Sequence, residues 1–278
     1  MQDVFAHCAE LVRANDRDRY LATLFAPVKT RGALYALYAF NSEVARVREL
    51  ARQPLPGEIR LQWWSDVLGG ERSEEASANP VASALLGAIA QHHIAPAGLI
   101  DLIDERRFDL YDEPMATIAD LEIYARRTSS ALFALAAQIL SSSKAESVAE
   151  PGGIAYAIVG LLRALPLHAA RHQLYVPTEI LDRHQVRTED LFAGRSGPGL
   201  KAALAELRDV ARQHLAVASR RIAELPNAAL PAFLPLALVR PSLARLERSD
   251  AFAPAELAAW RRQWLIWRSA RDTVRIAK

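Results

Sequence analysis

The sequence predicts an all-α fold, and three of its features support this. Apolar residues recur at helical spacing, as at Leu34, Leu37 and Tyr38. No segment alternates polar and apolar residues in the way that a half-buried strand does. Valine and isoleucine are sparse beside alanine and leucine, which are stronger helix formers. A chain of 278 residues can bury a large core, and we expect one domain over residues 1–278.

Prolines and cap residues divide the first half of the chain. Residues 15–18 can cap the segment that follows, and Pro27 ends it. Prolines and a glycine at 53–57 predict a loop, and the Ser- and Glu-rich residues 69–80 predict a flexible one. We expect a helix over Ile118–Leu140, with Asp120 and Thr117 as its N-cap candidates. The helices expected before it are Val4–Arg13, Tyr20–Phe25, Lys29–Val47, Glu58–Leu68, Val81–His92 and Pro96–Leu110.

The second half begins with a predicted surface linker at residues 141–153, rich in serine, proline and glycine. The stretch Gly153–Pro177 starts as an apolar helix, meets Pro166 and ends in an extended segment. A turn is expected at residues 195–199, and prolines interrupt the region from Pro226 to Pro235. The helices predicted beyond Pro177 are Glu179–His184, Leu200–Leu225 and Pro254–Ile276.

Composition excludes several classes of function. The net charge of +2 gives no argument for a nucleic acid partner. The single cysteine, Cys8, excludes an internal disulfide and a multi-cysteine zinc site, and we do not expect it to be a nucleophile. No apolar run reaches the ~18 residues of a membrane span. Asp3 and Glu10 precede any basic residue, which fits neither a signal peptide nor a transit peptide. We therefore expect a cytoplasmic protein.

Two segments carry a resemblance to a known family. The stretch 153–177 resembles the second signature of the squalene/phytoene synthases, a glycine-led helix running through LRD and ED to GRxYLP, but Ala164 and His168 stand where its aspartates would be. Residues 31–40, RGALYALYAF, resemble the approach to the first aspartate-rich motif, and 45–49, ARVRE, replace DDxxD. The matching residues of the second signature are Gly153, Ala155, Leu162, Arg163, Ala169, Tyr175 and Pro177.

The resemblance covers roughly residues 18–267 and implies the all-α isoprenoid-synthase bundle, whose central cavity holds prenyl diphosphates and Mg²⁺. Mg²⁺ is a hard cation that is held through carboxylate oxygens. Here the first segment keeps one acid, Glu49, and the second keeps none, so Ala45, Ala164 and His168 are lost metal positions. The resemblance therefore implies no metal cofactor and no catalytic residue of the usual kind.

The replacements themselves resemble a degenerate subgroup, typified by the mitochondrial complex I assembly factor with a phytoene-synthase-like fold. This implies a non-catalytic role in assembling a respiratory complex, or in binding a prenyl chain or another lipid. The alternative is an active, Mg²⁺-dependent prenyl transferase acting on farnesyl or geranylgeranyl diphosphate, and whether the chain is an enzyme stays open. The cavity residues that the resemblance implies are Arg31, Tyr38, Glu49, Asp109, Tyr124, Arg163, His168 and Tyr175.

Two other groups of residues have competing interpretations. Asp101, Glu105, Asp109 and Asp112 follow helical spacing, and a solvated face with ion pairs is favoured over a cation site. His168 and His172 have the spacing of a two-histidine metal face, but no third ligand lies nearby in the sequence.

The last predicted helix combines tryptophans with arginines. We favour an apolar stripe in the core with the arginines in water. The alternative is docking, on a respiratory-complex subunit or on an anionic membrane surface, which would place the protein at the periphery of the inner membrane. The stripe consists of Leu257, Trp260, Trp264, Trp267 and Val274, and the arginines on the remainder of the helix are Arg261, Arg262, Arg268, Arg271 and Arg275.

Overall fold

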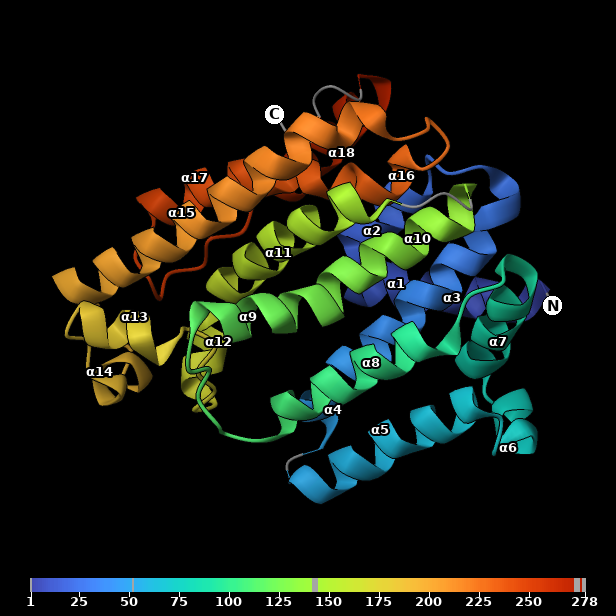
Figure 1. Cartoon of the computed structure of the whole chain (residues 1–278), viewed down its shortest axis with the longest axis horizontal. Coiled ribbons are helices and arrows are strands. Elements are labelled where there is room, and N and C mark those ends of the chain that lie inside the picture. Colours follow the sequence, from blue (N-terminus) through green and yellow to red (C-terminus); the bar gives the residue numbers. More distant parts are fainter. Residues whose placement is uncertain (1, 52, 142–144, 273–275, 277–278) are drawn as a thin grey trace. The chain divides into compact units, whose positions relative to one another are not determined.

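The computed structural model is helical and describes residues 2–51, 53–141, 145–272 and 276 (Figure 1). Among these residues there is no strand, and the all-α prediction is confirmed. None of the described helices is both long and apolar enough to cross a membrane. The chain groups into two compact units, which are described separately, and the single domain stays a prediction. Unit 1 comprises Met1–Leu110, Ala131–Glu146 and Glu224–Pro235, and unit 2 comprises Tyr111–Ser130, Ser147–Ala223 and Leu236–Lys278.

Unit 1 is built around α3, which packs against α1, α7, α8 and α10. Leu34, Leu37 and Phe40 of α3 are fully buried, because the helix is apolar on most of its circumference. The caps follow the prediction: the Asp16 side chain accepts from the backbone N–H of Arg19, and Pro27 precedes α3. The elements of unit 1 are α1 (Gln2–Asn15), α2 (Arg17–Thr23), α3 (Val28–Ala45), α4 (Val47–Leu50), α5 (Pro54–Gly69), α6 (Ser73–Ala78), α7 (Pro80–His92), α8 (Pro96–Arg106), a 3₁₀ turn (Arg107–Leu110), α10 (Ala131–Ser141) and α16 (Leu230–Phe233).

Both loops predicted in unit 1 contain helix. The prediction of a loop at 53–57 is wrong, because Pro54 and Pro56 lie in the first turn of α5, where a missing N–H costs no helical hydrogen bond. Glycine has no Cβ and therefore fits at position 57, where a Cβ would lie 2.4 Å from a methyl carbon of Leu110. The loop predicted at 69–80 contains α6, whose Glu75 accepts a hydrogen bond from the indole of Trp63 at 2.8 Å.

Unit 2 contains the stretch Gly153–Pro177. The N-cap of α9 is Thr117, and Asp120 is the third residue of the same capping box, so each accepts a hydrogen bond from the other's backbone N–H. The elements that lie wholly or mostly in unit 2 are α9 (Ile118–Ala125), a π-helical turn (Arg126–Ser130), α11 (Glu146–Arg163), α12 (Leu165–Ala170), α13 (Thr178–Arg183), α14 (Thr188–Phe192), α15 (Pro198–Arg221), 3₁₀ turns (Ile222–Glu224 and Leu234–Leu238), α17 (Val239–Arg248) and α18 (Ala259–Arg271).

The linker predicted at residues 141–153 is largely wrong. Residues 142–144 lie outside the described residues, but α11 begins at Glu146 and includes Pro151, Gly152 and Gly153, all of which are buried. A Cβ on Gly153 would lie 2.3 Å from the Cα of Ser130, so this glycine serves a close approach of two backbone segments rather than a turn.

The other boundaries of unit 2 are closer to the prediction. α11 ends at Arg163, and Pro166 lies in the first turn of α12, as its fixed φ favours. The last helix is shorter than the predicted Pro254–Ile276, since residues 254–258 are not helical and 273–275 lie outside the described residues.

The close approach at Gly153 predicts a large difference between two glycines of one helix. We expect Gly153→Ala to lower the free energy of unfolding by about 3 kcal/mol, since the new methyl group overlaps the backbone of Ser130. Gly160→Ala is the matched control, because no atom lies within 4 Å of its added Cβ. It should raise stability by about 0.5–1 kcal/mol. Urea denaturation measures both, and equal stabilities of the two variants would contradict the packing.

Candidate functional site

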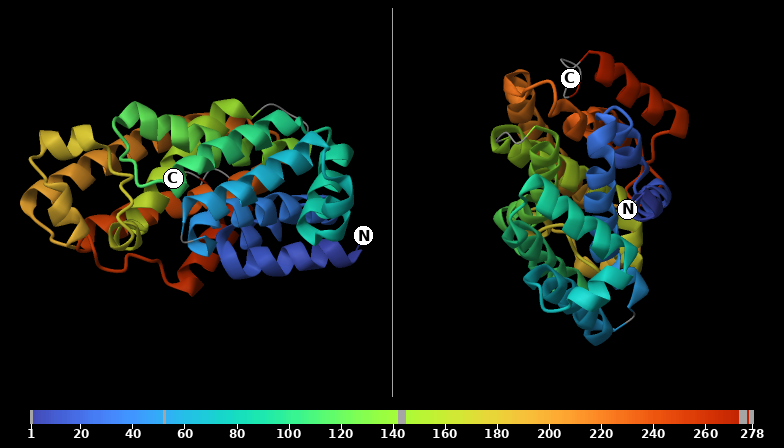
Figure 2. Two further views of the ribbon diagram at one scale, coloured as in Figure 1. Left: turned by 90° about the horizontal axis from the view of Figure 1, so that it is seen from below. Right: turned by 90° about the vertical axis from the view of Figure 1, so that its right-hand side faces the viewer.

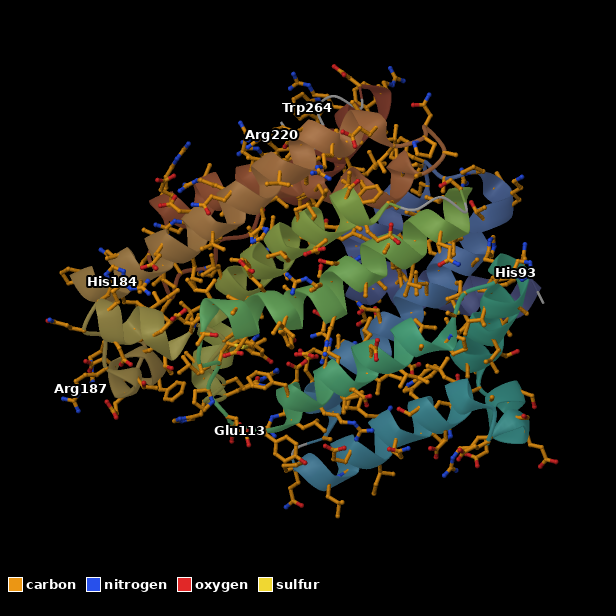
Figure 3. The ribbon with its side chains drawn as sticks, in the orientation of Figure 1. His93, Glu113, His184, Arg187, Arg220 and Trp264 are labelled. Carbon is orange, nitrogen blue, oxygen red and sulfur yellow. The ribbon has the colours of Figure 1, made fainter. Side chains whose placement is uncertain are left out.

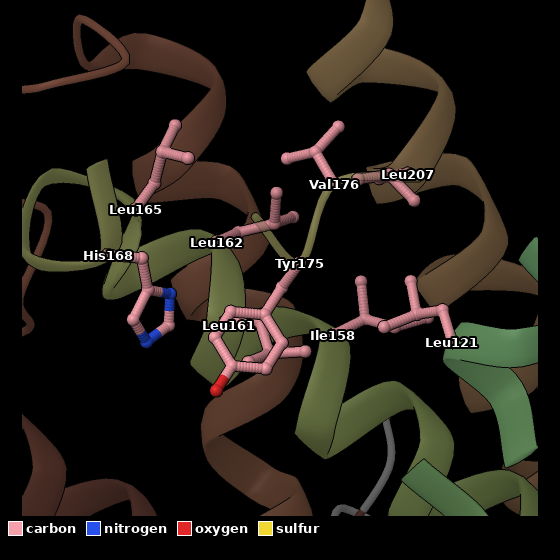
Figure 4. Close-up of a pocket in the computed structure, with 9 residues that line it drawn as sticks. All are labelled: Leu121, Ile158, Leu161, Leu162, Leu165, His168, Tyr175, Val176 and Leu207. Carbon is pink, nitrogen blue, oxygen red and sulfur yellow. The ribbon is translucent and has the colours of Figure 1, made fainter. Parts of the chain in front are cut away.

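A narrow apolar crevice in unit 2 brings together two of the predicted site residues, His168 and Tyr175 (Figure 4). The ring centroids of these two residues are 4.5 Å apart. In Figure 4 the His168 ring lies at one side of the crevice, Leu121 lies at the other, and the Tyr175 ring lies between them. The remaining lining residues are Ile158, Leu161, Leu162, Leu165, Val176 and Leu207.

Local structure explains why Tyr175 points into this crevice. The extended segment 173–177 is held by backbone hydrogen bonds to a second extended segment: the N–H of Met115 donates to Leu174 O at 3.1 Å, and the N–H of Thr178 donates to Met115 O at 2.9 Å. The Tyr124 ring of α9 lies 5.7 Å from the Tyr175 ring. Tyr124, Tyr175 and His168 therefore form one aromatic cluster, and their role in binding a ligand stays a prediction.

The crevice is small. Its free volume of about 10 Å³ is that of roughly one water molecule. Sites for small molecules usually enclose about 300 Å³ or more. In this conformation the crevice does not hold a prenyl chain.

Arg163, at the end of α11, has an unusual environment. Its side chain is 26% exposed, and its nearest acidic partner is Glu256, at 3.9 Å between Nη2 and Oε1. Its Nε is buried and has no hydrogen-bond partner among the described residues. A buried donor without a partner is costly, so this nitrogen is an exception to the usual satisfaction of buried polar groups.

In unit 1, Arg31 and Tyr38 are held by neighbouring groups. Arg31 donates from Nε to Ala26 O at 2.9 Å and from Nη2 to Leu24 O at 2.8 Å, so it binds the carbonyls of the turn before α3. Tyr38 is buried, and burial raises the pKa of its hydroxyl. The guanidinium of Arg19 lies 5.6 Å from the Tyr38 ring, a cation–π contact within the core of this unit.

The two acids predicted for the cavity are both paired with arginines. Glu49, on the exposed face of α4, accepts from Arg46 at 2.9 Å. Asp109, in the 3₁₀ turn after α8, is buried and accepts from Arg106 at 3.0 Å. Both carboxylates therefore have part of their hydrogen-bonding capacity occupied by a neighbouring guanidinium.

The side chains at the two matched segments do not fit Mg²⁺. Ala45 is the last residue of α3, and the helix is interrupted at Arg46, where φ is −102° and ψ is 8°. Positions 45 and 49 therefore do not lie on one continuous helix face. In the second segment Ala164 has no donor atom and His168 offers imidazole nitrogen, whereas Mg²⁺ prefers carboxylate and water oxygens.

The other candidate metal residues are dispersed. α8 ends at Arg106, so Asp101 and Asp112 do not share one helix, and the expectation of a solvated face is wrong for the buried Asp109. His172 follows α12 and its ring packs on Phe192, with centroids 4.8 Å apart. Over the described ranges of the chain, no group of three or more His, Cys, Asp or Glu side chains is arranged to hold a metal ion.

With this geometry established, comparison with known proteins identifies the family. The sequence model of squalene/phytoene synthases matches residues 12–268. The chain belongs to this family. The structure resembles that of a dehydrosqualene synthase in complex with a ligand, with a TM-score of 0.85 at 18% identity, and the match covers 98% of this chain and 97% of the other. The predicted isoprenoid-synthase fold is thereby confirmed.

Curated relatives within the family carry two kinds of name. The human NADH dehydrogenase (ubiquinone) complex I, assembly factor 6, is 31% identical over 246 residues, which are 88% of this chain and 74% of the relative. The 15-cis-phytoene synthase of Synechococcus elongatus is 24% identical over 287 aligned positions, covering 94% of this chain and 91% of the relative. The resemblance to both the synthases and the assembly factor is confirmed.

Sequence reasoning missed most of the apolar residues that line the crevice. Most of them lie in the stretch 153–177, where the prediction of site residues followed the polar positions of the motif. The helical spacing of these apolar residues could have indicated that they share a face. Leu121 and Leu207 come from α9 and α15, and no signal in the sequence joins these helices to the stretch. The burial of Arg19 was not predicted, because an arginine near the start of a helix is usually exposed.

The environment of Cys8 predicts an unreactive thiol. It is fully buried, and burial raises the pKa of the thiol to about 12, with a smaller contribution from the charge of Glu43. At pH 8 the thiolate fraction should be about a thousandfold smaller than in a free cysteine. We expect alkylation by iodoacetamide to be slower by at least this factor in the native protein than in urea. Equal rates would contradict the burial of Cys8.

Proposed function

We propose that this chain is a non-catalytic member of the squalene/phytoene synthase family that assists the assembly of respiratory complex I. The observation that carries the proposal is the set of residues at the two metal-binding segments of the family. The names of relatives that are 30–31% identical over most of the chain support the assembly role.

The chemical argument concerns the leaving group. Prenyl coupling begins when diphosphate leaves an allylic chain, and Mg²⁺ bound to carboxylates neutralises the developing charge. Here the side chains of Ala45 and Ala164 offer no oxygen, the His168 ring contacts the Tyr175 ring, and Glu49 is paired with Arg46. Arginines can neutralise a diphosphate directly, but they do not replace a cluster of divalent ions as a Lewis acid.

A lipid-binding role is the second part of the proposal, and Arg163 supports it. Its buried Nε lacks a partner among the described residues, at the end of the helix that also lines the crevice. A ligand with an anionic or carbonyl oxygen would satisfy this donor. Because the crevice has room for about one water, a prenyl tail would need other space or an opening of the crevice.

An active prenyl transferase is the competing function, since the phytoene synthase of Synechococcus elongatus aligns over most of this chain. Such an enzyme would have to use Glu49, Asp109 and cationic side chains in an unusual arrangement. Both acids contact arginines in this structure, so their use would require those ion pairs to rearrange.

We predict that the purified chain releases no pyrophosphate from farnesyl or geranylgeranyl diphosphate in the presence of Mg²⁺. The assay compares the chain with its Arg163→Ala variant, which removes the guanidinium at the end of α11 within the second segment, and with a phytoene synthase as positive control. Pyrophosphate release above the rate of Arg163→Ala, with a prenyl product, would contradict the non-catalytic function.

A second prediction tests assembly in the organism that encodes the chain. Deletion of the gene should lower assembled complex I and its NADH oxidation, while carotenoids and hopanoids stay unaltered. Reintroduced Gly160→Ala should restore the complex, whereas Gly153→Ala should restore less, in proportion to its lower stability. Unchanged complex I together with altered prenyl products would contradict an assembly role.

A further inference from the structure

The tryptophans of α18 face away from the core of the protein. Trp260, Trp264 and Trp267 are 70%, 45% and 43% exposed, whereas Ile266 and Ser269 of the same helix are buried. The expectation that the stripe lies in the core is therefore wrong for the three tryptophans, whereas Leu257 is buried. Val274, which was assigned to the same stripe, lies outside the described residues.

Helix geometry explains this orientation. The three tryptophans are spaced by four and three residues, which places them on one face, and Ile266 and Ser269 lie on the opposite one. Leu257 before the helix and Ile276 after it are also buried. With buried residues before, within and after α18, the tryptophan face is held outward. In Figure 2, α18 is the dark red helix that precedes the C-terminus.

The same helix carries positive charge. Its sequence, AWRRQWLIWRSAR, contains four arginines and no acid. The guanidinium of Arg268 lies 4.9 Å from the Trp264 ring, and that of Arg271 lies 4.1 Å from the Trp267 ring. Each of these pairs joins an apolar ring to a cation on the exposed side of the helix. Trp264 is one of the residues labelled in Figure 3.

Among the partners that could cover this face, the surface of an anionic bilayer is favoured by charge and by side-chain type. Tryptophan is enriched at membrane–water interfaces, because its ring is apolar and its N–H is polar. Arginine binds phosphate through two parallel hydrogen bonds. A second copy of the chain would place the positive charge of one α18 against that of another, which is unfavourable.

We propose that α18 docks the protein on the surface of a membrane that contains anionic phospholipids. Trp260, Trp264 and Trp267 enter the interface between headgroups and acyl chains, while Arg268 and Arg271 exchange their contacts with the rings for lipid phosphates. The helix lies in the plane of the interface. This docking does not depend on the assembly role, and its test does not measure complex I.

The test is co-sedimentation of the full chain with vesicles of phosphatidylglycerol and phosphatidylcholine, and with vesicles of phosphatidylcholine alone. We expect binding to the anionic vesicles that weakens as salt is raised, because salt screens the arginines. Trp264→Ala/Trp267→Ala should weaken binding at least tenfold. Arg268→Gln/Arg271→Gln should weaken it about twenty-five-fold, from about fivefold per arginine.

Two control variants test whether binding depends on this face of α18 or on exposed apolar and basic residues anywhere on the surface. Leu55→Ala/Ile59→Ala removes two residues that are even more exposed on α5, and Arg187→Gln/Arg195→Gln removes two arginines from the region of α14 and the turn after it. Both control variants should bind as the wild type does. Circular dichroism and thermal unfolding check that the α18 variants keep the helical fold at the temperature of the binding assay.

A second readout does not depend on substitution by alanine. Brominated anionic lipids should quench the fluorescence of the wild type more strongly than that of Trp264→Phe/Trp267→Phe. Three results would overturn the proposal: no binding to anionic vesicles, equal binding by the tryptophan variant, or a dimer that depends on Trp264 and Trp267 without vesicle binding. The last result would assign the face to a second copy of the chain.

Discussion

The close contact between α11 and the π-helical turn at residues 126–130 is the constraint on which unit 2 depends. The Cβ of any other residue at Gly153 would overlap the backbone of Ser130, and a Cβ at Gly152 would lie 2.8 Å from Leu236. Two adjacent glycines thus fix the position of α11 along its length. From this position the helix runs to its end at Arg163, and the chain then turns through α12 and returns to place Tyr175 beside Tyr124 and His168.

The elements that resemble the family's second signature are therefore present, while the loss of its metal chemistry is our proposal. The glycine-led helix, the break near Pro166 and the extended segment that ends at Pro177 are all present. At the positions of the aspartates, however, stand a residue without a donor and an imidazole that packs on an aromatic ring. Packing contacts without hard oxygen ligands at these two positions support the proposed change from catalysis to binding or assembly.

The sequence predicted the class of the fold, many of its helices and the caps at Asp16 and Thr117, because helical spacing and capping are local signals. The predictions were wrong where the same residue type occurs in two different structural contexts. Glycines and prolines at 53–57 and 151–153 were assigned to loops, but they serve first turns and close helix contacts, which depend on neighbours far along the chain. The tryptophan stripe of α18 was assigned to the core because apolar faces usually are, and only the burial of Ile266 shows which face is inward. The pairing of Glu49 and Asp109 with arginines three residues away was within reach of the sequence, whereas the contribution of Leu121 and Leu207 to the crevice was not.

Titration of Mg²⁺ into the full chain, in the presence of a farnesyl diphosphate analogue that cannot ionise, tests the loss of metal chemistry most directly. A chain without the necessary oxygen ligands should show no Mg²⁺ binding beyond that of the analogue alone. Saturable Mg²⁺ binding that requires both the chain and the analogue, and that is lost in Glu49→Gln/Asp109→Asn, would show that these acids leave their arginines to hold the metal. That result would contradict a non-catalytic function.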